Sequence, residues 1–353
     1  MQLFHVSGIR HQRCPREESH QTSPEHNFVY FEPGTYIKGA LEYTTAKDFF
    51  TVGHGVLSGE NYAYQANTLQ GYVSSKDDRS SLRLISHQAV SDNQTWTCVG
   101  VTLNAPPFNS VDLFPREATN HEEDNRVRIR VEDYKQVGAF YFQTDGLPAH
   151  GGSITSVFLH ANDDALKLYY SDAHVTDVVV WKVHNDPVIQ LGWKPRNISN
   201  VVVDTVDVIH SRWAFSQTAV PSAIIGAAPY YTDPKLVDAG RTISAVVRNL
   251  RCEGKCAALL RIAPMNTYDL RIETVRFDEL LADDRARLGM SLVGTKISDQ
   301  EDAYVHGQEV LRMGIHVRDW LIAGRRVCAD NWRSEELGQL NFNIGFWGQW
   351  SIA

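Results

Sequence analysis

Three aspartates near the middle of the chain, Asp145, Asp163 and Asp164, have the residue type and spacing that hydrolysis of a glycosidic bond needs. A carboxylic acid can protonate the leaving oxygen, while a second, ionised carboxylate activates the attacking water. In enzymes that invert the sugar carbon, these two carboxyl groups stand about 6.5–9.5 Å apart, which leaves room for the water. Acid–base hydrolysis is therefore one chemistry open to this cluster.

The aspartates lie in a repeated pattern of apolar and polar residues. The segment 157–168 contains Asp163 and Asp164, and a similar segment returns 23 residues later at 180–191. The valines at 178–180 are matched after the same interval by the valines at 201–203. A repeat of this length indicates a supersecondary unit that buries its apolar face by stacking on its neighbours. Because the units have strand patterns, we expect a β-solenoid.

Stacking would bring acids from adjoining rungs together, since stacked strands lie roughly 4.7–4.9 Å apart. Neighbouring residues within one strand point to opposite faces. Asp163 and Asp164 can therefore share a face only at a bend, which the preceding Asn162 favours. Asn and Asp also cap turns at rung corners, and this structural role remains open for the aspartates and for Asn185 and Asp186.

Many short apolar segments separated by Gly, Asn and Asp predict an all-β fold. The predicted strands include 96–103, 138–142, 154–158, 166–170, 175–182, 188–191, 201–209, 243–247, 259–262, 270–275, 289–292 and 340–344. One segment, 277–288, has a pattern that fits a short helix. Residues 1–27 are polar and lack periodicity, so we expect a disordered lead-in before a solenoid domain at 28–353.

Composition and charge argue against several classes of protein. A formal net charge of −8 disfavours a nucleic-acid or anionic-membrane partner, because either needs a basic face. The chain has no run of about 18 apolar residues, so no transmembrane span is expected. The N-terminus of this sequence lacks the apolar core of a secretory signal. We expect no cofactor, no metal ion and a monomer.

The five cysteines are too few for a disulfide scaffold. Cys252 and Cys256 are separated by three residues, so they could form a small disulfide in an oxidising compartment or remain two free thiols. No second Cys or His pair with zinc-ligand spacing lies nearby in the sequence. A zinc site is therefore not expected.

Eight motifs follow one another along the chain. They are FEPGTYIKGALEY (31–43), GHGVLSGENY (53–62), NAPPFN (104–109), FQTDG (142–146), NDDA (162–165), HNDP (184–187), PSAIIGA (221–227) and WGQWSI (347–352). In this order they resemble glycoside hydrolase family 49, which includes fungal dextranases and isopullulanase, over residues 28–353. The resemblance implies a right-handed parallel β-helix and inverting, endo-acting hydrolysis of α-1,6 linkages in dextran.

The resemblance also implies roles for single residues by their position in the motifs. Asp163 would be the general acid, and Asp145 and Asp164 would activate water, without a decision on which of the two dominates. Clustering fits these roles, because nearby like charges disfavour ionisation and keep one group protonated. The candidates for contacts with glucose units, whose alternative role is packing between rungs, are Gln143, Lys167, Tyr169, Asn185, Asp186 and Trp193.

Members of this family carry a secretory signal and an N-terminal β-sandwich, and this sequence shows neither. The resemblance still implies an extracellular protein. Its partner would be an α-glucan polysaccharide.

Three alternatives remain open. An isopullulanase would cut α-1,4 linkages in pullulan. A pectin-cleaving β-helix hydrolase also uses clustered aspartates, but it needs basic side chains to hold uronates, which the net charge of −8 disfavours. A catalytically inactive carbohydrate-binding β-helix is the third alternative, and the presence of all three aspartates favours an enzyme over it.

Overall fold

The computed structural model describes residues 4–6, 20–22, 24–77, 79–91, 93–114, 127–183, 185, 187–212, 223–227, 237–256, 258–280, 288–292, 303–306, 309–328, 330–331, 341–343 and 350–352. Within these ranges strands are the only regular elements, which confirms the all-β class. No helix in the same ranges has the length and apolar character needed to cross a membrane. The chain divides into two compact units, Met1–Leu166 and Lys167–Ala353.

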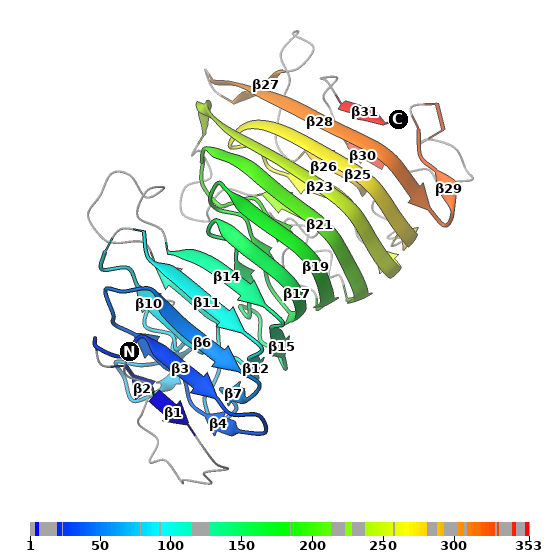
Figure 1. Ribbon diagram of the computed structural model, residues 1–353. Helices are drawn as coiled ribbons and strands as arrows, with labels where there is room; N and C mark the ends of the chain where they lie inside the picture. The colour runs from blue at the N-terminus through cyan, green and yellow to red at the C-terminus, as the bar shows by residue number, and fades with distance from the viewer. Residues whose placement is uncertain are drawn as a thin grey trace. The chain divides into compact units, whose positions relative to one another are not determined.

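The first unit is a stack of short parallel strands, coloured blue to green in Figure 1. Its strands are β1 (Phe4–Val6), β2 (His20–Gln21), β3 (Phe28–Phe31), β4 (Tyr36–Lys38), β5 (Leu41–Tyr43), β6 (Phe49–Gly53), β7 (Val56–Ser58), β8 (Ala66–Asn67), β9 (Val73–Ser74), β10 (Ile85–Gln88), β11 (Thr95–Val99), β12 (Thr102–Asn104), β13 (Val111–Phe114), β14 (Arg128–Glu132), β15 (Lys135–Val137), β16 (Leu147–Pro148) and β17 (Gly152–Ala161). The strand β18 (Leu166–Lys167) lies where the two units meet in the sequence.

Three parallel ladders run through this unit. One joins β3, β6, β11, β14 and β17, the second joins β4, β7, β12, β15 and β17, and the third joins β2, β5, β10 and β13. The short strands β8 and β9 pair in antiparallel fashion within the loop that separates β7 from β10. Each coil thus pairs with the next one along the chain, which is the arrangement of a parallel β-solenoid.

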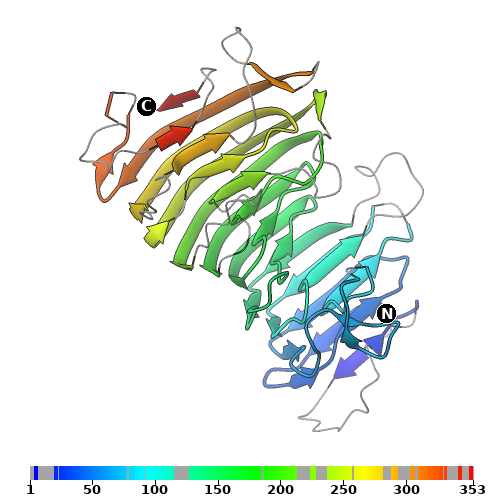
Figure 2. The same ribbon diagram turned by 180° about the vertical axis from the view of Figure 1, so that it is seen from behind.

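The second unit is also a parallel solenoid, seen from behind in Figure 2. Its strands are β19 (Ala173–Lys182), β20 (Ile189–Gln190), β21 (Ile198–Ser211), β22 (Ile225–Ala227), β23 (Asp238–Cys256), β24 (Leu260–Ile262), β25 (Asn266–Leu280), β26 (Leu288–Leu292), β27 (Ala303–His306), β28 (Glu309–Ile322), β29 (Arg325–Arg326), β30 (Asn341–Asn343) and β31 (Trp350–Ile352). Long strands form one parallel ladder, β19–β21–β23–β25–β28–β31, and short strands form another, β20–β22–β24–β26–β30.

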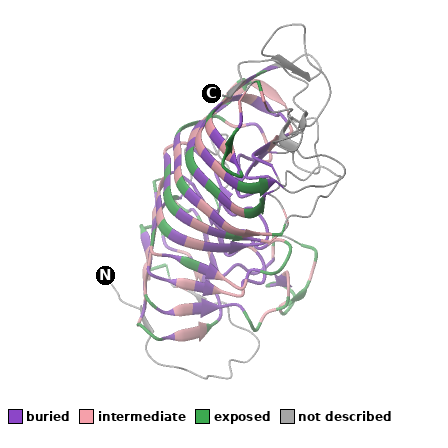
Figure 3. Ribbon diagram, turned by 90° about the vertical axis from the view of Figure 1, so that its right-hand side faces the viewer, coloured by how far each residue is buried: buried purple, intermediate pink, exposed green. Residues whose placement is uncertain are grey.

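Inward-facing apolar residues from successive coils stack into columns, so buried and exposed residues alternate along the strands (Figure 3). In the second unit one column consists of Val178, Val206, Leu250, Val275 and Trp320, paired in that order. All five are at most 2% exposed. Burial of each such side chain contributes about 1.5–3 kcal/mol relative to exposure, so the columns stabilise the stack.

In each of the five strands that contribute to this column, the backbone bends at the residue just before the buried side chain. Asp177, Thr205, Asn249, Thr274 and Asp319 all have left-handed backbone conformations, with φ of 56–57°. Asn and Asp tolerate this conformation, whereas the β-branched threonines are strained in it. The bend is therefore a repeated property of the coil, and the residue type at it changes from coil to coil.

The interval of 23 residues holds for only part of the stack. Ile129 pairs with Gly152 at that interval, but Val178 pairs with Val206, 28 residues later. The predicted match of the valines at 178–180 to those at 201–203 is therefore wrong. Consecutive valines fit a strand pattern in several registers, and connections of different length between the strands change the interval from coil to coil.

Three local predictions also differ from the structure. The segment 277–288 was expected to be helical, but Phe277 continues β25 and points into the core, and 281–287 lies outside the described residues. The segment 138–142 was expected to be a strand, but it follows the end of β15 as an irregular turn. Within the lead-in, β1 pairs with β3 and β2 with β5, so these two short segments are ordered as strands.

The disulfide considered for Cys252 and Cys256 is not formed, because both are buried free thiols. The two residues lie in one strand, opposite Phe277 and Leu280 of β25. Four residues of extended chain span roughly 13 Å, whereas a disulfide needs Cα atoms about 4.4–6.8 Å apart. The register between β23 and β25 is irregular between the two cysteines, but both residues remain in β23. The thiols therefore pack in the core and form no cross-link.

Candidate active site

The three predicted acids lie at the ends of two neighbouring coils in the first unit. Asp145 comes just before β16, and Asp163 and Asp164 come just after β17, where the backbone bends. The bend expected from the sequence is thus confirmed. All three side chains are nearly buried, with exposed fractions of 8%, 7% and 3%. Nearby carboxylates withdrawn from water repel one another, which marks the cluster as a candidate site rather than a stabilising feature.

Backbone hydrogen bonds fix the two acid-bearing bends against each other. The carbonyl of Thr144 accepts bonds from the N–H groups of Asn162 (3.3 Å) and Asp163 (3.4 Å). Two residues further on, the N–H of Gly146 donates to the carbonyl of Asp164 at 2.8 Å. These bonds involve the two residues that flank Asp145 in the sequence. The backbones carrying the acids are therefore one rung spacing apart, roughly 4.8 Å.

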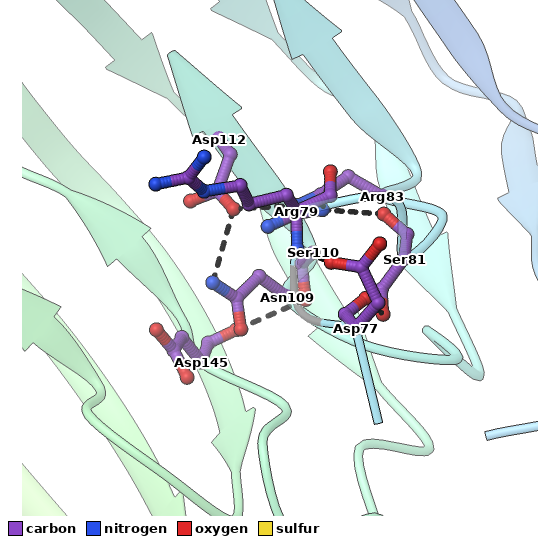
Figure 4. A network of polar contacts seen from close by, with 8 residues as sticks. All are labelled: Asp77, Arg79, Ser81, Arg83, Asn109, Ser110, Asp112 and Asp145. Atoms are coloured by element: carbon purple, nitrogen blue, oxygen red, sulfur yellow. Dashed lines mark hydrogen bonds and ion pairs between the residues drawn. The ribbon is translucent and has the colours of Figure 1, made fainter. Parts of the chain in front are cut away.

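A buried glutamine ties the same two bends together from inside the coil. Gln136, at 0% exposure, donates through Nε2 to the carbonyl of Asp145 and to the carbonyl of His160, both at 3.0 Å. The Asp145 carbonyl also accepts a bond from Ser110 Oγ at 3.0 Å. Figure 4 shows the Asp145 carboxylate directed away from Ser110, on the opposite side of its backbone. The backbone of this aspartate is thus anchored by two side chains, neither of which uses its carboxylate.

An ion-pair network lies beside Ser110 on the preceding coil, and it includes the nearby residues Asn109 and Asp112 (Figure 4). Arg83 Nε lies 2.8 Å from Asp112 Oδ2, and Asn109 Nδ2 donates to the same oxygen at 3.0 Å. Arg83 also donates through Nη1 to the carbonyl of Ser81 at 2.5 Å. Both side chains of the ion pair are largely buried, so solvent screens the pair less than a surface one. This network stiffens the turn from which Ser110 reaches the candidate site.

The second bend has hydrogen bonds of its own. Asp163 Oδ1 accepts a bond from the N–H of Asp164 at 3.1 Å, which is a local side-chain-to-backbone bond typical of Asp at turns. Asn162, 1% exposed, donates through Nδ2 to the carbonyl of Phe140 at 2.8 Å. The predicted turn-capping role of this segment is therefore present alongside the clustering of acids.

Among the predicted sugar contacts, Gln143 belongs to the first unit. Its Oε1 accepts bonds from Tyr64 Oη at 2.8 Å and from Gln65 Nε2 at 2.6 Å. These donors come from the long loop between β7 and β10. Gln143 is thus held beside the acid cluster by a different coil.

The other predicted contacts belong to the second unit. Lys167 is 5% exposed, and the ring of Tyr169 lies under the guanidinium of Arg196, 4.8 Å from it. The carbonyl of Asn185 accepts a bond from the Lys182 ammonium. Trp193 is half-buried in its unit, and Asp186 lies outside the described residues. Contact with a sugar stays a prediction for these five positions, as it does for Gln143.

Sequence reasoning missed Gln136 and Ser110. Gln136 occupies an inward position of β15, where the period-two pattern predicts an apolar residue. A polar residue at such a position is the signal that could have identified it. Ser110 carries no comparable signal, because a serine in a turn is ordinary.

Three protein-family models match parts of this chain. Residues 234–353 match the model of glycosyl hydrolase family 49. Residues 107–146 match the solenoid repeat of dextranase, and residues 181–213 match that of isopullulanase. The chain belongs to glycoside hydrolase family 49. The dextranase repeat ends at Gly146, so it includes Ser110, Gln136 and Asp145.

Individual relatives of this family 49 chain are similar over most of its length. A dextranase from Talaromyces minioluteus is 42% identical over 328 residues, which is 92% of this chain and 51% of the relative. An isopullulanase from Aspergillus niger is 40% identical over 254 residues, 69% of this chain and 44% of the relative. The solved structure of Dex49A from Penicillium minioluteum superimposes with a TM-score of 0.81 at 42% identity, covering 94% of this chain and 55% of that one. The chain thus spans about half the length of these relatives.

Proposed function

We propose that this protein hydrolyses α-1,6 linkages within dextran chains, and that residues 28–353 form its catalytic β-helix. The observation that carries the proposal is the position of Asp145, Asp163 and Asp164 on hydrogen-bonded bends of adjoining coils. The dextranase relative, at 42% identity over 92% of the chain, supports the choice of substrate. The protein would act outside the cell, as a monomer and without a cofactor.

In the proposed reaction Asp163 gives its proton to the glycosidic oxygen as the bond to the anomeric carbon breaks. Its Oδ1 accepts the backbone bond from Asp164, so the proton would be carried on Oδ2. Asp145 or Asp164 removes a proton from water, whose oxygen bonds to the anomeric carbon from the opposite face. One product end is then a hemiacetal of inverted configuration, the other is a free hydroxyl, and the acid is regenerated by proton exchange with water.

A second candidate is cleavage of α-1,4 linkages in pullulan. The isopullulanase relative at 40% identity favours it, and residues 181–213 match the isopullulanase repeat. The same three carboxylates would perform the same proton transfers, so the two candidates differ only in how the glucan is held.

The test is release of reducing ends from dextran, pullulan and polygalacturonate by the full chain. The proposal predicts release from dextran and little from polygalacturonate, together with first formation of the inverted anomer in proton NMR of the products. Release of reducing ends from pullulan but not from dextran would show that the second candidate, cleavage of α-1,4 linkages, is the function. Binding of dextran without release of reducing ends would mean an inactive carbohydrate-binding solenoid.

A further inference from the structure

Three consecutive aromatic residues are exposed just before the acid cluster. Phe140, Tyr141 and Phe142 are 70%, 44% and 54% exposed, and they lie in the segment 138–142, where the sequence pattern predicts a strand. Burial of aromatic rings stabilises a fold, so a fold that leaves much of three adjacent rings exposed to water forgoes part of that stabilisation. Contiguous exposed apolar surface of this kind marks a binding site.

The aromatic turn is held in place rather than loosely exposed. Thr144 Oγ1 donates to the carbonyl of Tyr141 at 2.7 Å, and the buried Asn162 donates to the carbonyl of Phe140 at 2.8 Å. The Phe140 ring meets the His160 ring edge-on, with centroids 4.7 Å apart. Asn162 directly precedes the two aspartates of the second bend, so one side chain links the turn to the acid-bearing coil.

A second segment extends this surface. Tyr64, from the loop between β7 and β10, stacks on Tyr141 with centroids 5.1 Å apart and an interplanar angle of 21°. Its hydroxyl donates to Gln143 Oε1, as does Gln65 Nε2. Because Oε1 accepts both bonds, the orientation of the Gln143 amide beside the rings is fixed.

We propose that Tyr64, Phe140, Tyr141 and Phe142 form an aromatic platform that binds glucose units of an α-glucan chain next to Asp145. A pyranose ring presents C–H groups on its faces, and these pack favourably on the electron-rich face of an aromatic ring. The tyrosine hydroxyls and the Gln143 amide at the edge of the platform suit the sugar hydroxyls, as a few polar groups do in a mainly apolar site. Only Gln143 and Thr144 separate the platform from Asp145 in the chain.

The choice of a glucan as the occupant rests on the proposed function. The platform itself does not require hydrolysis, because the stacking surface and the acid cluster consist of different residues. Binding and cleavage are therefore measured separately in the test.

The experiment measures dextran affinity by calorimetry in the full chain carrying Asp163→Asn, so that no substrate is consumed. Adding Tyr141→Ala and Phe142→Ala should weaken dextran binding at least tenfold. In a chain that keeps Asp163, the Tyr141→Ala and Phe142→Ala substitutions together should raise KM for dextran by a similar factor. They should leave kcat within about twofold of wild type. Trp181→Ala, which removes a 41% exposed aromatic from β19, is the matched control and should change neither quantity.

Unchanged dextran affinity in the platform variant would overturn the inference, as would an equal loss in the Trp181→Ala control. A shift from dimer to monomer in light scattering without loss of dextran affinity would assign the rings to a contact between copies and likewise overturn it. If the double variant melts early, Tyr141→Ser alone replaces it under the same criteria. Dextran binding that depends on the platform, without release of reducing ends, would uphold the platform and refute the hydrolytic function.

Discussion

At the scale of single residues, the acid cluster depends on side chains that carry no charge. The Asp145 carbonyl accepts bonds from Ser110 and Gln136, and Gln136 also reaches the carbonyl of His160 on the next coil. Together with the backbone bonds between the two bends, one buried amide thus fixes the distance between the bend that carries Asp145 and the strand that leads to Asp163. Displacements of an ångström between reacting groups can cost about 10²-fold in rate.

Replacing Gln136 with Leu is predicted to lower kcat on dextran about 10–100-fold with little change in KM. The substitution keeps the side-chain size but removes one donor from each of two buried carbonyls, and the Asp145 carbonyl keeps its bond from Ser110. Each lost bond costs about 0.5–1.5 kcal/mol. Ser110→Ala removes only one bond to Asp145 and should have a smaller effect in the same direction. Steady-state kinetics and thermal melts of both variants check this. A lower melting temperature with wild-type kcat would show a purely structural role.

A second residue-scale prediction concerns Glu60 in the loop that follows β7. The hydrogen bonds from Lys38 and Tyr36 lower the pKa of Glu60 below its ordinary 4.5. A depressed pKa gives stability that is present above pH 4.5 and is lost as the pH falls through the folded-state value. Because both partners are partly exposed, solvent screens the pair and its contribution is small. In urea unfolding, the Glu60→Gln variant should therefore have a lower free energy of unfolding than wild type at pH 7. The two free energies should converge at pH 3.

At the scale of elements, the coils of the second unit share a left-handed bend whose residue is not always suited to it. Asn249 and Asp319 tolerate φ near 56°, and the Asn249 amide also donates to Asp204 at 2.7 Å. Thr274 occupies the same place between them with φ 57°, although a β-branched residue is strained there. The solenoid keeps the bend because the apolar columns on either side fix the register.

Changing Thr274 to Asn is therefore predicted to stabilise the protein by about 1 kcal/mol, by relief of left-handed strain. For a unit of this size the gain corresponds to a rise in melting temperature of about 2–4 °C. Thr242→Asn is the matched control, because Thr242 lies in β23 and is not among the left-handed residues. Asn is disfavoured in a regular strand, so the control should be neutral or destabilising. Equal changes in both variants would contradict the role of the bend.

At the scale of the whole molecule, the sequence predicted the fold class well and the register poorly. Alternating runs such as 175–182 and 201–209 fall inside β19 and β21, because burial of one strand face imposes a period of two. The interval between coils could not be predicted from Val178–Val180, since several registers bury the same number of valines. Nor did the pattern at Phe140–Phe142 reveal that these rings stay exposed, because aromatics in a strand-like run ordinarily face a core.

The position of the three acids on neighbouring coils was predicted, and so was the bend that allows Asp163 and Asp164 to leave strand geometry. Their supports were not, because Gln136 and Ser110 act through backbone carbonyls that any sequence would provide. The turn-capping alternative also applies in part, as the bond from the Asp164 N–H to Asp163 shows. A residue can thus have both a structural and a chemical role at one corner of a solenoid.

The most direct test of the account is the initial rate of reducing-end release from dextran by the wild-type chain and by its Asp163→Asn variant, with matched melting temperatures. Loss of a general acid costs about 10²–10⁴-fold, and we predict a fall of about 10³-fold. At least one of Asp145→Asn and Asp164→Asn should cause a loss of similar size, because one of these two acids is proposed to activate the water. A rate within tenfold of wild type in Asp163→Asn, or in both Asp145→Asn and Asp164→Asn, would contradict the claim that these acids act together on one glucan linkage.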